Sequence, residues 1–462
     1  MTMMDRATGA GIALNRFGLG ARPDEDLPAD PQGWLLQQFD RYEARPPAWS
    51  AQPGSADLAA RYAQQQRAVR EQQGDARAAA RQALQQGLRE SYRGAVDARV
   101  ASALLTPAPF VERLVHFWAN HFAVSAEKPV VAGLAGAFEA EAIRPHVLGR
   151  FEDMLLAVEQ HPAMQVFLDQ VRSAGPDSMA AMQATRRNAE RVPGLNENLA
   201  REILELHTLG VRSGYQQADV TEFARALTGW SVGGLGPRDE GTPGAFLFRA
   251  RLHEPGARTI LGKAYAQPGE GQARAVLHDL AQAPATAQHL AAKLARHFVA
   301  DNPPPALVAR LADAYLRGGG ELPALYRELV RAPEAWAPAP AKFKTPWDWT
   351  LSSLRGLGVR EPGRLPYAPL LAQLGQPVWR PGSPAGYDDI AASWAAPDAL
   401  VRRVELAQRF AARVGDRLDA RALAPRLLPG TLSPATGEAV ARAESPATAL
   451  ALLLVSPDFL RR

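Results

Sequence analysis

Residues 84–104 read LQQGLRESYRGAVDARVASAL, and this stretch decides the fold class. Its apolar side chains recur at every fourth position, at Leu84, Leu88, Tyr92, Val96, Val100 and Leu104. Because an α-helix turns once in about 3.6 residues, this spacing forms a slowly drifting apolar stripe, with Arg and Gln on the other faces. The stretch therefore predicts a long amphipathic helix with one solvated face.

Much of the 462-residue chain has a similar composition. Segments rich in Ala, Leu, Arg, Glu and Gln, broken by Pro and Gly, favour helices, and runs of β-branched residues are few. We predict further helices over residues 109–122, 151–160, 196–209 and 217–228, because each begins or ends near a Pro or Gly. The fold class expected is mainly α, as a single large helical body.

Three segments interrupt the helical pattern. Residues 173–195 combine Gly, Pro, Ser, Met and Arg without a period, which predicts a long loop. Residues 245–252 are typical of a strand, and residues 258–261 could return beside it, which predicts a small β-hairpin inserted in the helical body. Residues 376–394 hold Pro and Trp without a helical period and predict an irregular segment packed by its aromatic rings.

These features divide the chain into five sections. They are an N-terminal helical region with the long amphipathic helix (1–108), a central helical core with the polar motifs (109–230), the β-hairpin insertion (231–272), the continued helical core (273–340) and a C-terminal helical and Pro/Trp-rich section (341–462).

The charge balance argues against nucleic-acid binding. The formal net charge is +4, and arginine supplies 47 of the 52 basic residues. Between Arg61 and Arg99 eight arginines stand against four acidic residues, an excess equal to that of the whole chain. A nucleic-acid site needs a denser basic face interleaved with stacking aromatic rings, so we expect no nucleic-acid partner.

The absence of cysteine excludes disulfides, thiolate metal sites and cysteine nucleophiles. Polar and charged residues interrupt positions 1–23, so no signal-peptide apolar core is present. The longest apolar run, residues 447–455, is shorter than the ~20 residues of a membrane span. We expect no membrane span and a cytoplasmic location; the alternative is the periplasm, reached in complex with a signal-bearing partner.

The first candidate catalytic residues lie in the motif HFWANHF at residues 116–122. His116 and His121 are five residues apart, about 140° around a helix, so an unbroken helix cannot direct both to one metal. His116 shares a face with Asn120, whereas His121 lies on the apolar side. We favour two buried, hydrogen-bonded histidines over metal ligation, and a divalent metal cofactor is not favoured.

The densest polar motif is NENLAREILELHTLG at residues 196–210. Its candidate residues are Asn196, Asn198, Arg201, Glu202, Glu205 and His207. Asn196 can cap the helix, Arg201 can pair with Glu205, and His207 lies at the edge of the apolar stripe. On the surface this is an ion-paired face; in a cleft, Glu202 or Glu205 could act as a catalytic acid or base.

Weaker binding candidates are Asp219, Arg225, Trp230, His253, Lys293 and Arg296. The first three follow the polar motif and could form a second wall of a cleft. His253, beside Glu254, lies at the predicted hairpin tip and projects into a cleft or makes the turn. The last two, next to His297, could bind an anion or occupy a surface.

Several blocks together resemble one known family. They are residues 14–23 (LNRFGLGARP), 116–122, 196–202, 205–210, 227–230 (LTGW), 261–262, 293–296 (KLAR) and 456–460 (SPDFL). Over nearly its whole length the chain resembles the bacterial family catalogued as domain of unknown function 1800. It departs from the family pattern at Gln216, where Thr is usual, and at Glu254 and Arg258, where Asp and Lys are common. The longer carboxylate of Glu254 argues against a metal-ligand role.

The resemblance implies a genomic setting rather than a reaction. Members are often encoded beside a protein similar to sulfatases and phosphatases that carries a twin-arginine export signal. We therefore expect a helper or binding protein for a partner polypeptide such as that exported hydrolase-like protein. The sequence assigns no oligomeric state.

Two alternatives stay open. One is a hydrolase or transferase whose cleft uses the histidines and glutamates of the two polar motifs, which requires the helices around Trp118 and Arg201 to meet in a common interior. The other is a glycan- or peptide-binding module, which requires the C-terminal tryptophans to be exposed in a groove.

Overall fold

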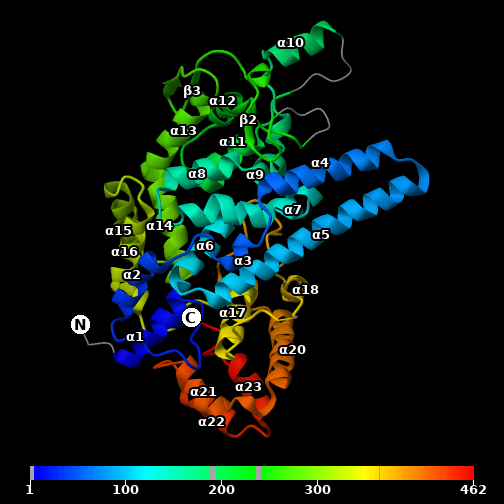
Figure 1. The fold of residues 1–462 in the computed structure, drawn as a ribbon. Helices are drawn as coiled ribbons and strands as arrows, with labels where there is room; N and C mark the ends of the chain where they lie inside the picture. Colours follow the sequence, from blue (N-terminus) through cyan, green and yellow to red (C-terminus); the bar gives the residue numbers. More distant parts are fainter. Residues whose placement is uncertain (1–4, 188–193, 236–240, 364) are drawn as a thin grey trace.

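The computed structural model describes residues 5–187, 194–235, 241–363 and 365–462. The protein is mainly helical, with two small two-stranded antiparallel sheets, which confirms the predicted fold class (Figure 1). None of the described helices is both long and apolar enough to cross a membrane.

The N-terminal region ends in a helical arm. Its helices are α1 (Arg6–Ile12), α2 (Pro31–Arg41), α3 (Pro47–Ser50), α4 (Ser55–Glu71) and α5 (Gly74–Leu105). Helices α4 and α5 run antiparallel and extend beyond the rest of the molecule (Figure 1). The predicted stripe on α5 is confirmed: Val96, Val100 and Leu104 are buried in the body, and the stripe becomes less buried toward the tip of the arm.

The body is built from two runs of helices. The first run is α6 (Pro109–His121), α7 (Pro129–Phe138), α8 (Phe151–Gln160), α9 (Pro162–Phe167), α10 (Met179–Arg186), α11 (Asn198–Glu202) and α12 (Gln217–Leu227). The second run is α13 (Glu270–Gln282), α14 (Pro284–Phe298), α15 (Pro305–Arg317) and α16 (Leu322–Arg331). The predicted helices over 109–122, 151–160 and 217–228 are confirmed within two residues.

Helix α6 is the central helix of the body. Every one of its residues except Asn120 is buried. A helix buried all round must satisfy its polar side chains internally, and α6 carries two charged residues and two histidines on its buried faces. The partners of these side chains define the sites described below.

The C-terminal section contains α17 (Pro346–Gly356), α18 (Tyr367–Gln373), α19 (Ala391–Trp394), α20 (Pro397–Val414), α21 (Ala420–Leu427), α22 (Pro434–Ala441) and α23 (Pro446–Leu454). The last residues return to the body, where Arg462 N donates to Lys342 O at 2.8 Å and Lys344 N donates to Leu460 O at 2.8 Å. The irregular segment predicted over residues 376–394 is confirmed for residues 376–390, but its last four residues form the short helix α19.

The predicted β-hairpin is wrong. Strand β2 (Phe246–Phe248) pairs with β1 (Trp230–Val232), and β3 (Arg258–Ile260) pairs with β4 (Lys263–Tyr265). The second pair closes through Leu261 and Gly262, both at positive φ, as a two-residue hairpin turn requires. The two segments expected to pair with each other therefore belong to different sheets.

The predicted loop over residues 173–195 is also wrong in part. It contains α10, whose start is capped by the Ser178 hydroxyl accepting from Ala181 N at 3.3 Å. Residues 188–193 of the expected loop, and 236–240 of the expected insertion, lie outside the described residues.

In the part of the chain that the structure describes, three helices continue into π-helical turns, at residues 13–17, 139–143 and 203–207. The last of these follows α11, so the single helix expected over residues 196–209 is an α-helix for five residues and a π-helix for the next five. Such turns add a residue to the helical repeat and are frequent at functional sites.

Candidate functional site

The two histidines of α6 face different surroundings, as their spacing predicts. Trp347 Nε1 donates to His116 Nδ1 at 3.1 Å, whereas His121 Nε2 lies 3.1 Å from the backbone oxygen of His207. His116 is 8% exposed and His121 is 1% exposed. Two buried, hydrogen-bonded histidines are therefore confirmed.

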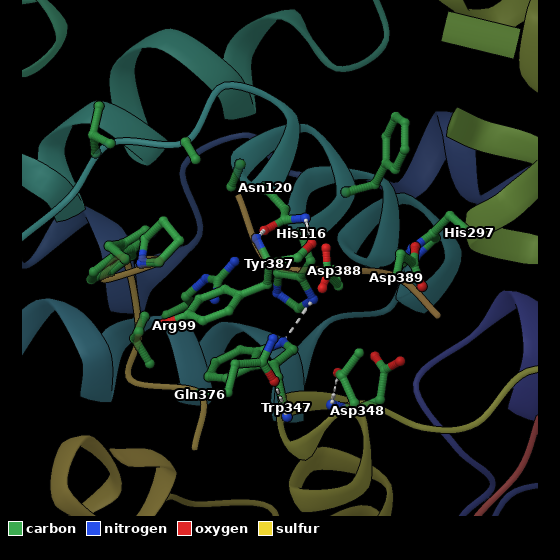
Figure 2. Close-up of a pocket in the computed structure, with 18 residues that line it drawn as sticks. Arg99, His116, Asn120, His297, Trp347, Asp348, Gln376, Tyr387, Asp388 and Asp389 are labelled. Atoms are coloured by element: carbon green, nitrogen blue, oxygen red, sulfur yellow. Dashed lines mark hydrogen bonds and ion pairs between the residues drawn. The ribbon is translucent and has the colours of Figure 1, made fainter. Parts of the chain in front are cut away.

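His116 borders a cavity of about 80 Å³ enclosed by α6, α14, the start of α17 and residues 376–389 (Figure 2). Its polar lining includes Arg99, His116, Asn120, His297, Asp348 and Asp389. One buried water needs only about 10–15 Å³, so the cavity has room for several waters or a small polar group.

Asn120 fastens one wall of this cavity. Its Nδ2 donates to Tyr387 O at 2.9 Å, and its Oδ1 accepts from Tyr387 N at 2.7 Å. A Cβ at Gly386 would lie 2.2 Å from the Asn120 backbone oxygen, so only glycine fits there. Through these two hydrogen bonds, Asn120 holds the irregular segment against α6.

A histidine–carboxylate pair lies at one end of the cavity. His297 Nδ1 is 2.5 Å from Asp389 Oδ2, and Lys342 Nζ contacts Asp301 Oδ1 at 2.5 Å and Asp389 Oδ1 at 3.4 Å. Burial lowers the pKa of His297, so the neutral ring donates from Nδ1 and leaves a lone pair on Nε2. Among the described residues, Nε2 is buried without a hydrogen-bond partner.

Asp389 is ionised in this pair. Burial opposes its ionisation, but the hydrogen bond from His297 and the charge of Lys342 hold the pKa of Asp389 well below its usual value. The pair thus consists of a carboxylate and an oriented neutral imidazole.

Buried ion pairs surround His116. Glu112 accepts from Arg144 at 2.8 and 2.9 Å, and its Oε1 lies 3.8 Å from His116 Nε2. Arg99 pairs with Glu139 at 2.8 Å and stacks 4.4 Å from the centre of the Trp347 ring. Burial and the Arg99 charge hold the pKa of His116 well below its usual value, so His116 is neutral. Because its Nδ1 accepts from Trp347, its proton is on Nε2.

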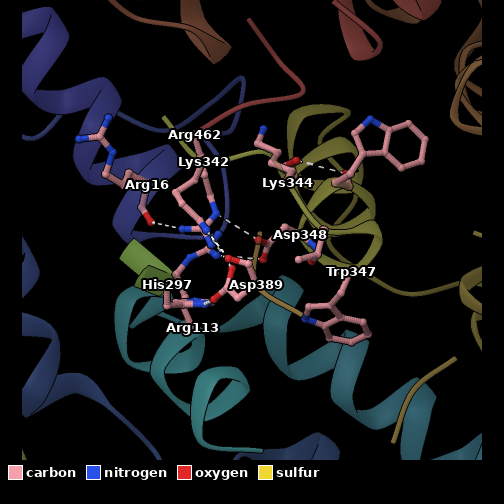
Figure 3. A network of polar contacts seen from close by, with 12 residues as sticks. Arg16, Arg113, His297, Lys342, Lys344, Trp347, Asp348, Asp389 and Arg462 are labelled. Atoms are coloured by element: carbon pink, nitrogen blue, oxygen red, sulfur yellow. Dashed lines mark hydrogen bonds and ion pairs between the residues drawn. The ribbon is translucent and has the colours of Figure 1, made fainter. Parts of the chain in front are cut away.

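Asp348 joins three distant parts of the chain (Figure 3). Its Oδ1 accepts from Arg113 Nη1 at 2.9 Å, and its Oδ2 accepts from Arg462 Nε at 3.1 Å. Although burial opposes ionisation, these two arginines hold the pKa of Asp348 well below its usual value. The carboxylate therefore connects α6, α17 and the C-terminal segment.

His121 belongs to a second, separate cluster. His207 Nδ1 lies 2.7 Å from Glu159 Oε1, and the His121 ring centre is 6.4 Å from that of His207 and 6.0 Å from that of His289. Burial lowers the pKa of His121 strongly and that of His289 to about 4. The helices around Trp118 and Arg201 thus meet in a common interior, through His121 and His207.

No contact of the described residues joins His116 to this second cluster. In the described part of the chain, no group of three or more His, Asp or Glu side chains is placed to hold a metal ion. The expected catalytic set is therefore divided between two places.

The glutamates of the second motif lie mainly at the surface. Arg201 pairs with Glu205 at 3.5 Å, as predicted, and with Glu197 at 3.2 Å. Asn198 is exposed, and Glu202 is half-buried, so burial raises its pKa. This face is ion-paired, as the surface alternative expected, but its charged side chains are half-buried, and Glu202 lies close enough to His207 for the two groups to interact electrostatically.

Asn196 holds the start of the polar helix. Its Oδ1 accepts from Asn198 N at 2.9 Å, and its Nδ2 donates to the backbone oxygens of Leu168 and Asp169 at 3.2 and 3.3 Å. The N-cap residue of α11 is Glu197 rather than the predicted Asn196, but the Asn196 side chain binds the first helical amide and joins the helix start to the end of α9.

Asp219 and Arg225 make local contacts on α12 rather than a cleft wall. Asp219 accepts from Leu261 N at 2.7 Å and from Gln216 N at 2.8 Å. Arg225 pairs with Glu222 at 3.2 Å. These side chains fix the turn of the second sheet and the start of the helix.

Trp230 and His253 are also structural. Trp230 is fully buried and packs on Phe246 with ring centres 5.1 Å apart. His253 Nδ1 donates to Thr228 O at 2.9 Å, and the buried Glu254 accepts from Asp177 N at 2.9 Å. His253 therefore does not project from a hairpin tip, because that hairpin does not form.

The last candidates, Lys293 and Arg296, both precede the cavity residue His297 on α14. Arg296 Nε donates to Asp301 O at 3.2 Å. Burial lowers the pKa of the half-buried Lys293 to about 8. Neither residue lines the cavity.

The exposed tryptophans required by the glycan-binding hypothesis are absent from the C-terminal section. Trp347, Trp349, Trp379 and Trp394 are 5%, 0%, 6% and 7% exposed. Their rings pack inside the protein, so the premise of that hypothesis is wrong.

Sequence reasoning missed Asp348, Asp389 and Arg99. Asp389 follows another aspartate inside a Pro/Trp-rich segment, which is an unusual place for two acids, and this was the available signal. Its partner His297 is 92 residues away in the chain, so no spacing rule could join them.

A wider groove of about 540 Å³ lies between α5, α7 and α18. Its apolar lining includes Leu88, Tyr92, Pro129, Ala132, Ala368 and Pro377. Arg89, Arg93 and Arg380 line it with exposed side chains, against one acid, Glu127. None of these three arginines forms an ion pair with the described residues.

Residues 376–381 separate the groove from the cavity. Pro377 and Arg380 line the groove, whereas Trp379 lines the cavity. Tyr92 Oη donates to Val378 O at 2.7 Å, and Trp379 has a positive φ of 48°, which a bulky residue rarely adopts. This wall is therefore held by contacts from both sides.

The chain matches, over residues 12–461, the family described as "Protein of unknown function (DUF1800)". It belongs to this family, as the sequence motifs indicate. No curated protein and no solved structure matches it.

Proposed function

We propose that this protein is a helper that binds a partner polypeptide in the groove between α5, α7 and α18. The observation that carries the proposal is the set of three exposed arginines, unpaired among the described residues, around an apolar lining. A complementary ligand has an apolar side for Leu88 and Tyr92 and carboxylates for the arginines. An amphipathic acidic segment of a polypeptide has this chemistry.

The partner proposed is the exported hydrolase-like protein that the family resemblance implies. A helper that captures an acidic amphipathic segment of an incompletely folded hydrolase would shield its apolar face until folding is complete. The groove of about 540 Å³ runs beside α5 of the arm and is lined by three exposed arginines, which suits a segment of chain better than a small molecule.

The test is a titration of the purified neighbour-encoded protein with the purified full chain. Arg93→Glu and Arg380→Glu should each weaken binding at least ~10-fold, because each replaces an attractive charge by a repulsive one. The matched control is Arg81→Glu, an exposed arginine of the same helix α5 outside the groove, which should leave the affinity unchanged. Equal affinities for all four proteins would refute the groove as the binding site.

The helper role needs a second readout. The yield of folded partner, measured by its own hydrolytic activity after refolding, should rise with the wild-type chain and not with Arg93→Glu. If the chain bound the partner without raising this yield, it would be a binding protein, and the helper role would be refuted.

A second candidate function, hydrolysis or group transfer, is favoured by one observation. The neutral His297, oriented by Asp389, has a buried Nε2 without a partner among the described residues, beside a cavity that can hold water. Such a ring can accept a proton from a water or hydroxyl nucleophile. In this candidate function the carboxylate at the site is Asp389, rather than Glu202 or Glu205, which the sequence suggested.

Its test is turnover of chromogenic carboxylate, phosphate and sulfate esters by the purified chain. His297→Gln and Asp389→Asn should each reduce kcat at least ~100-fold, whereas His278→Gln at an exposed histidine should not. Turnover that survives His297→Gln, or no turnover of any ester class, would exclude this candidate.

A further inference from the structure

Positive charge exceeds negative charge in the buried region where the N-terminal helix meets the C-terminal segment (Figure 3). Six cationic side chains there are each at most 3% exposed: Arg16, Arg113, Lys342, Lys344, Arg403 and Arg462. Asp348 pairs with Arg113 and Arg462, and Lys342 pairs with Asp301 and Asp389. Burial lowers the pKa of Lys344 to about 7, so Arg16 and Arg403 are the guanidinium groups of this set without a carboxylate partner among the described residues.

Two of these guanidinium groups are neighbours. Arg462 Nη1 donates to the Arg16 backbone oxygen at 3.5 Å, and burial together with the Arg462 charge lowers the pKa of Arg16 to about 10. Arg16 therefore stays charged at neutral pH. Arg462 is paired with Asp348, but Arg16 has no carboxylate partner among the described residues, and a buried charge without one is strongly unfavourable.

Both arginines have a donor to spare. Arg16 Nη1 and Nη2 donate to Ala335 O and Ala339 O at 2.6 and 3.0 Å, but its Nε is buried without a partner among the described residues. Arg462 Nη2 is likewise buried without a hydrogen-bond partner among the described residues. Buried donors of native proteins are almost always satisfied by protein, water or ion.

A cavity of about 20 Å³ lies between these groups. It is lined by Arg16, Arg462 and Arg461, with Asn15, Thr431 and Asp458. This volume holds one particle of the size of a water molecule or a halide, and it is too small for phosphate or sulfate. Asp458 Oδ2 is already engaged by the Ser433 amide and hydroxyl at 2.8 and 2.7 Å, and three arginines in the lining exceed this one carboxylate.

We propose that this cavity is a chloride-binding site in which Arg16 Nε and Arg462 Nη2 are the charged donors. The ion neutralises the buried charge of Arg16, accepts the spare donor of Arg462, and joins the π-helical turn at residues 13–17 to the C-terminal segment. The site is independent of the groove and of the cavity beside His116.

The first test is thermal unfolding of the full chain in sodium chloride and in sodium gluconate at equal ionic strength. The unfolding temperature should rise in chloride and saturate with its concentration, because an ion that binds the folded state stabilises it by mass action. Bromide soaked into crystals should give an anomalous peak between the two donor atoms. A water there, without a bromide peak, would overturn the proposal.

Two variants separate specific binding from general salt effects. Arg16→Met keeps the aliphatic stem and removes the charge, so the difference between chloride and gluconate should disappear. Arg403→Met removes another buried cation that does not line the cavity, and it should keep that difference even if it is less stable. Equal unfolding temperatures of the wild type in both salts would refute the site, and the bromide experiment decides if Arg16→Met does not fold.

Discussion

Replacing Asp348 by asparagine tests the central ion-pair network. Asp348→Asn keeps the size of the side chain but leaves Arg113 and Arg462, which are 2% and 3% exposed, without their carboxylate. Removing one member of a buried ion pair costs about 3–5 kcal/mol, because the remaining charge is buried and unpaired. The unfolding entropy of a 462-residue chain is about 1 kcal/mol per kelvin, so the unfolding temperature should fall by about 3–5 °C.

Calorimetry and urea unfolding measure this change, and its pH dependence identifies the cause. The pKa of Asp348 is lower in the folded than in the unfolded state, so its contribution is complete above the unfolded value of about 4 and is lost as pH falls below it. The difference between wild type and Asp348→Asn should therefore shrink in acid.

The matched control is Glu438→Gln, which breaks an exposed pair with Arg442 at 3.2 Å. Exposed pairs contribute at most about 1 kcal/mol, so this variant should unfold within about 1 °C of wild type. If Asp348→Asn were as stable as Glu438→Gln at pH 7, the reasoning about buried charge would be refuted.

Two further predictions concern the histidines and the cavity wall. Burial lowers the pKa of His116, His121 and His289, so the unfolded state binds more protons than the folded state, and the free energy of unfolding should fall as pH decreases from about 6.5 toward 4. His289→Gln should make this pH dependence less steep when stability is measured by urea unfolding. An unchanged slope would contradict the prediction. Asn120→Ala removes both hydrogen bonds to Tyr387, each of which contributes about 1 kcal/mol. Limited proteolysis should therefore cleave residues 382–388 faster in this variant than in wild type. An unchanged cleavage rate would show that other contacts hold this wall of the cavity.

The sequence predicted the elements whose signals are local. The four-residue period of α5 and the Pro and Gly boundaries of α8 and α12 lie within one helix, so they need no knowledge of the rest of the chain. The β-pairing failed because residues 245–252 and 258–261 each had two available partners. The turn at Leu261 and Gly262 and the return of β2 to Trp230 decided between them.

The faces of α11 were harder to predict than its position. Regular helical spacing places Glu202 and Glu205 on one face, but the π-helical turn at residues 203–207 changes the angle between successive side chains. Arg201 still reaches Glu205, while His207 turns inward to Glu159. The one-residue expansion therefore turns His207 inward, while Glu202 stays close enough to His207 and Glu159 for their charges to affect its pKa.

The candidate sites follow from the burial of α6, and this explains both what could and what could not be predicted. An apolar helix carrying Glu112, Arg113, His116 and His121 shows from sequence alone that each needs a buried partner. The partners are supplied by Arg144, Asp348, Trp347 and the backbone of His207, at sequence separations of 32, 235, 231 and 86 residues. Spacing rules act within one element, so they show the requirement and not the partner. Because α6 collects partners from the central, the continued and the C-terminal helical sections, a substitution on its buried faces should disturb much of the protein, whereas the exposed arginines of the groove can be changed one at a time. The groove is therefore the part of the molecule where function can be tested without loss of the fold.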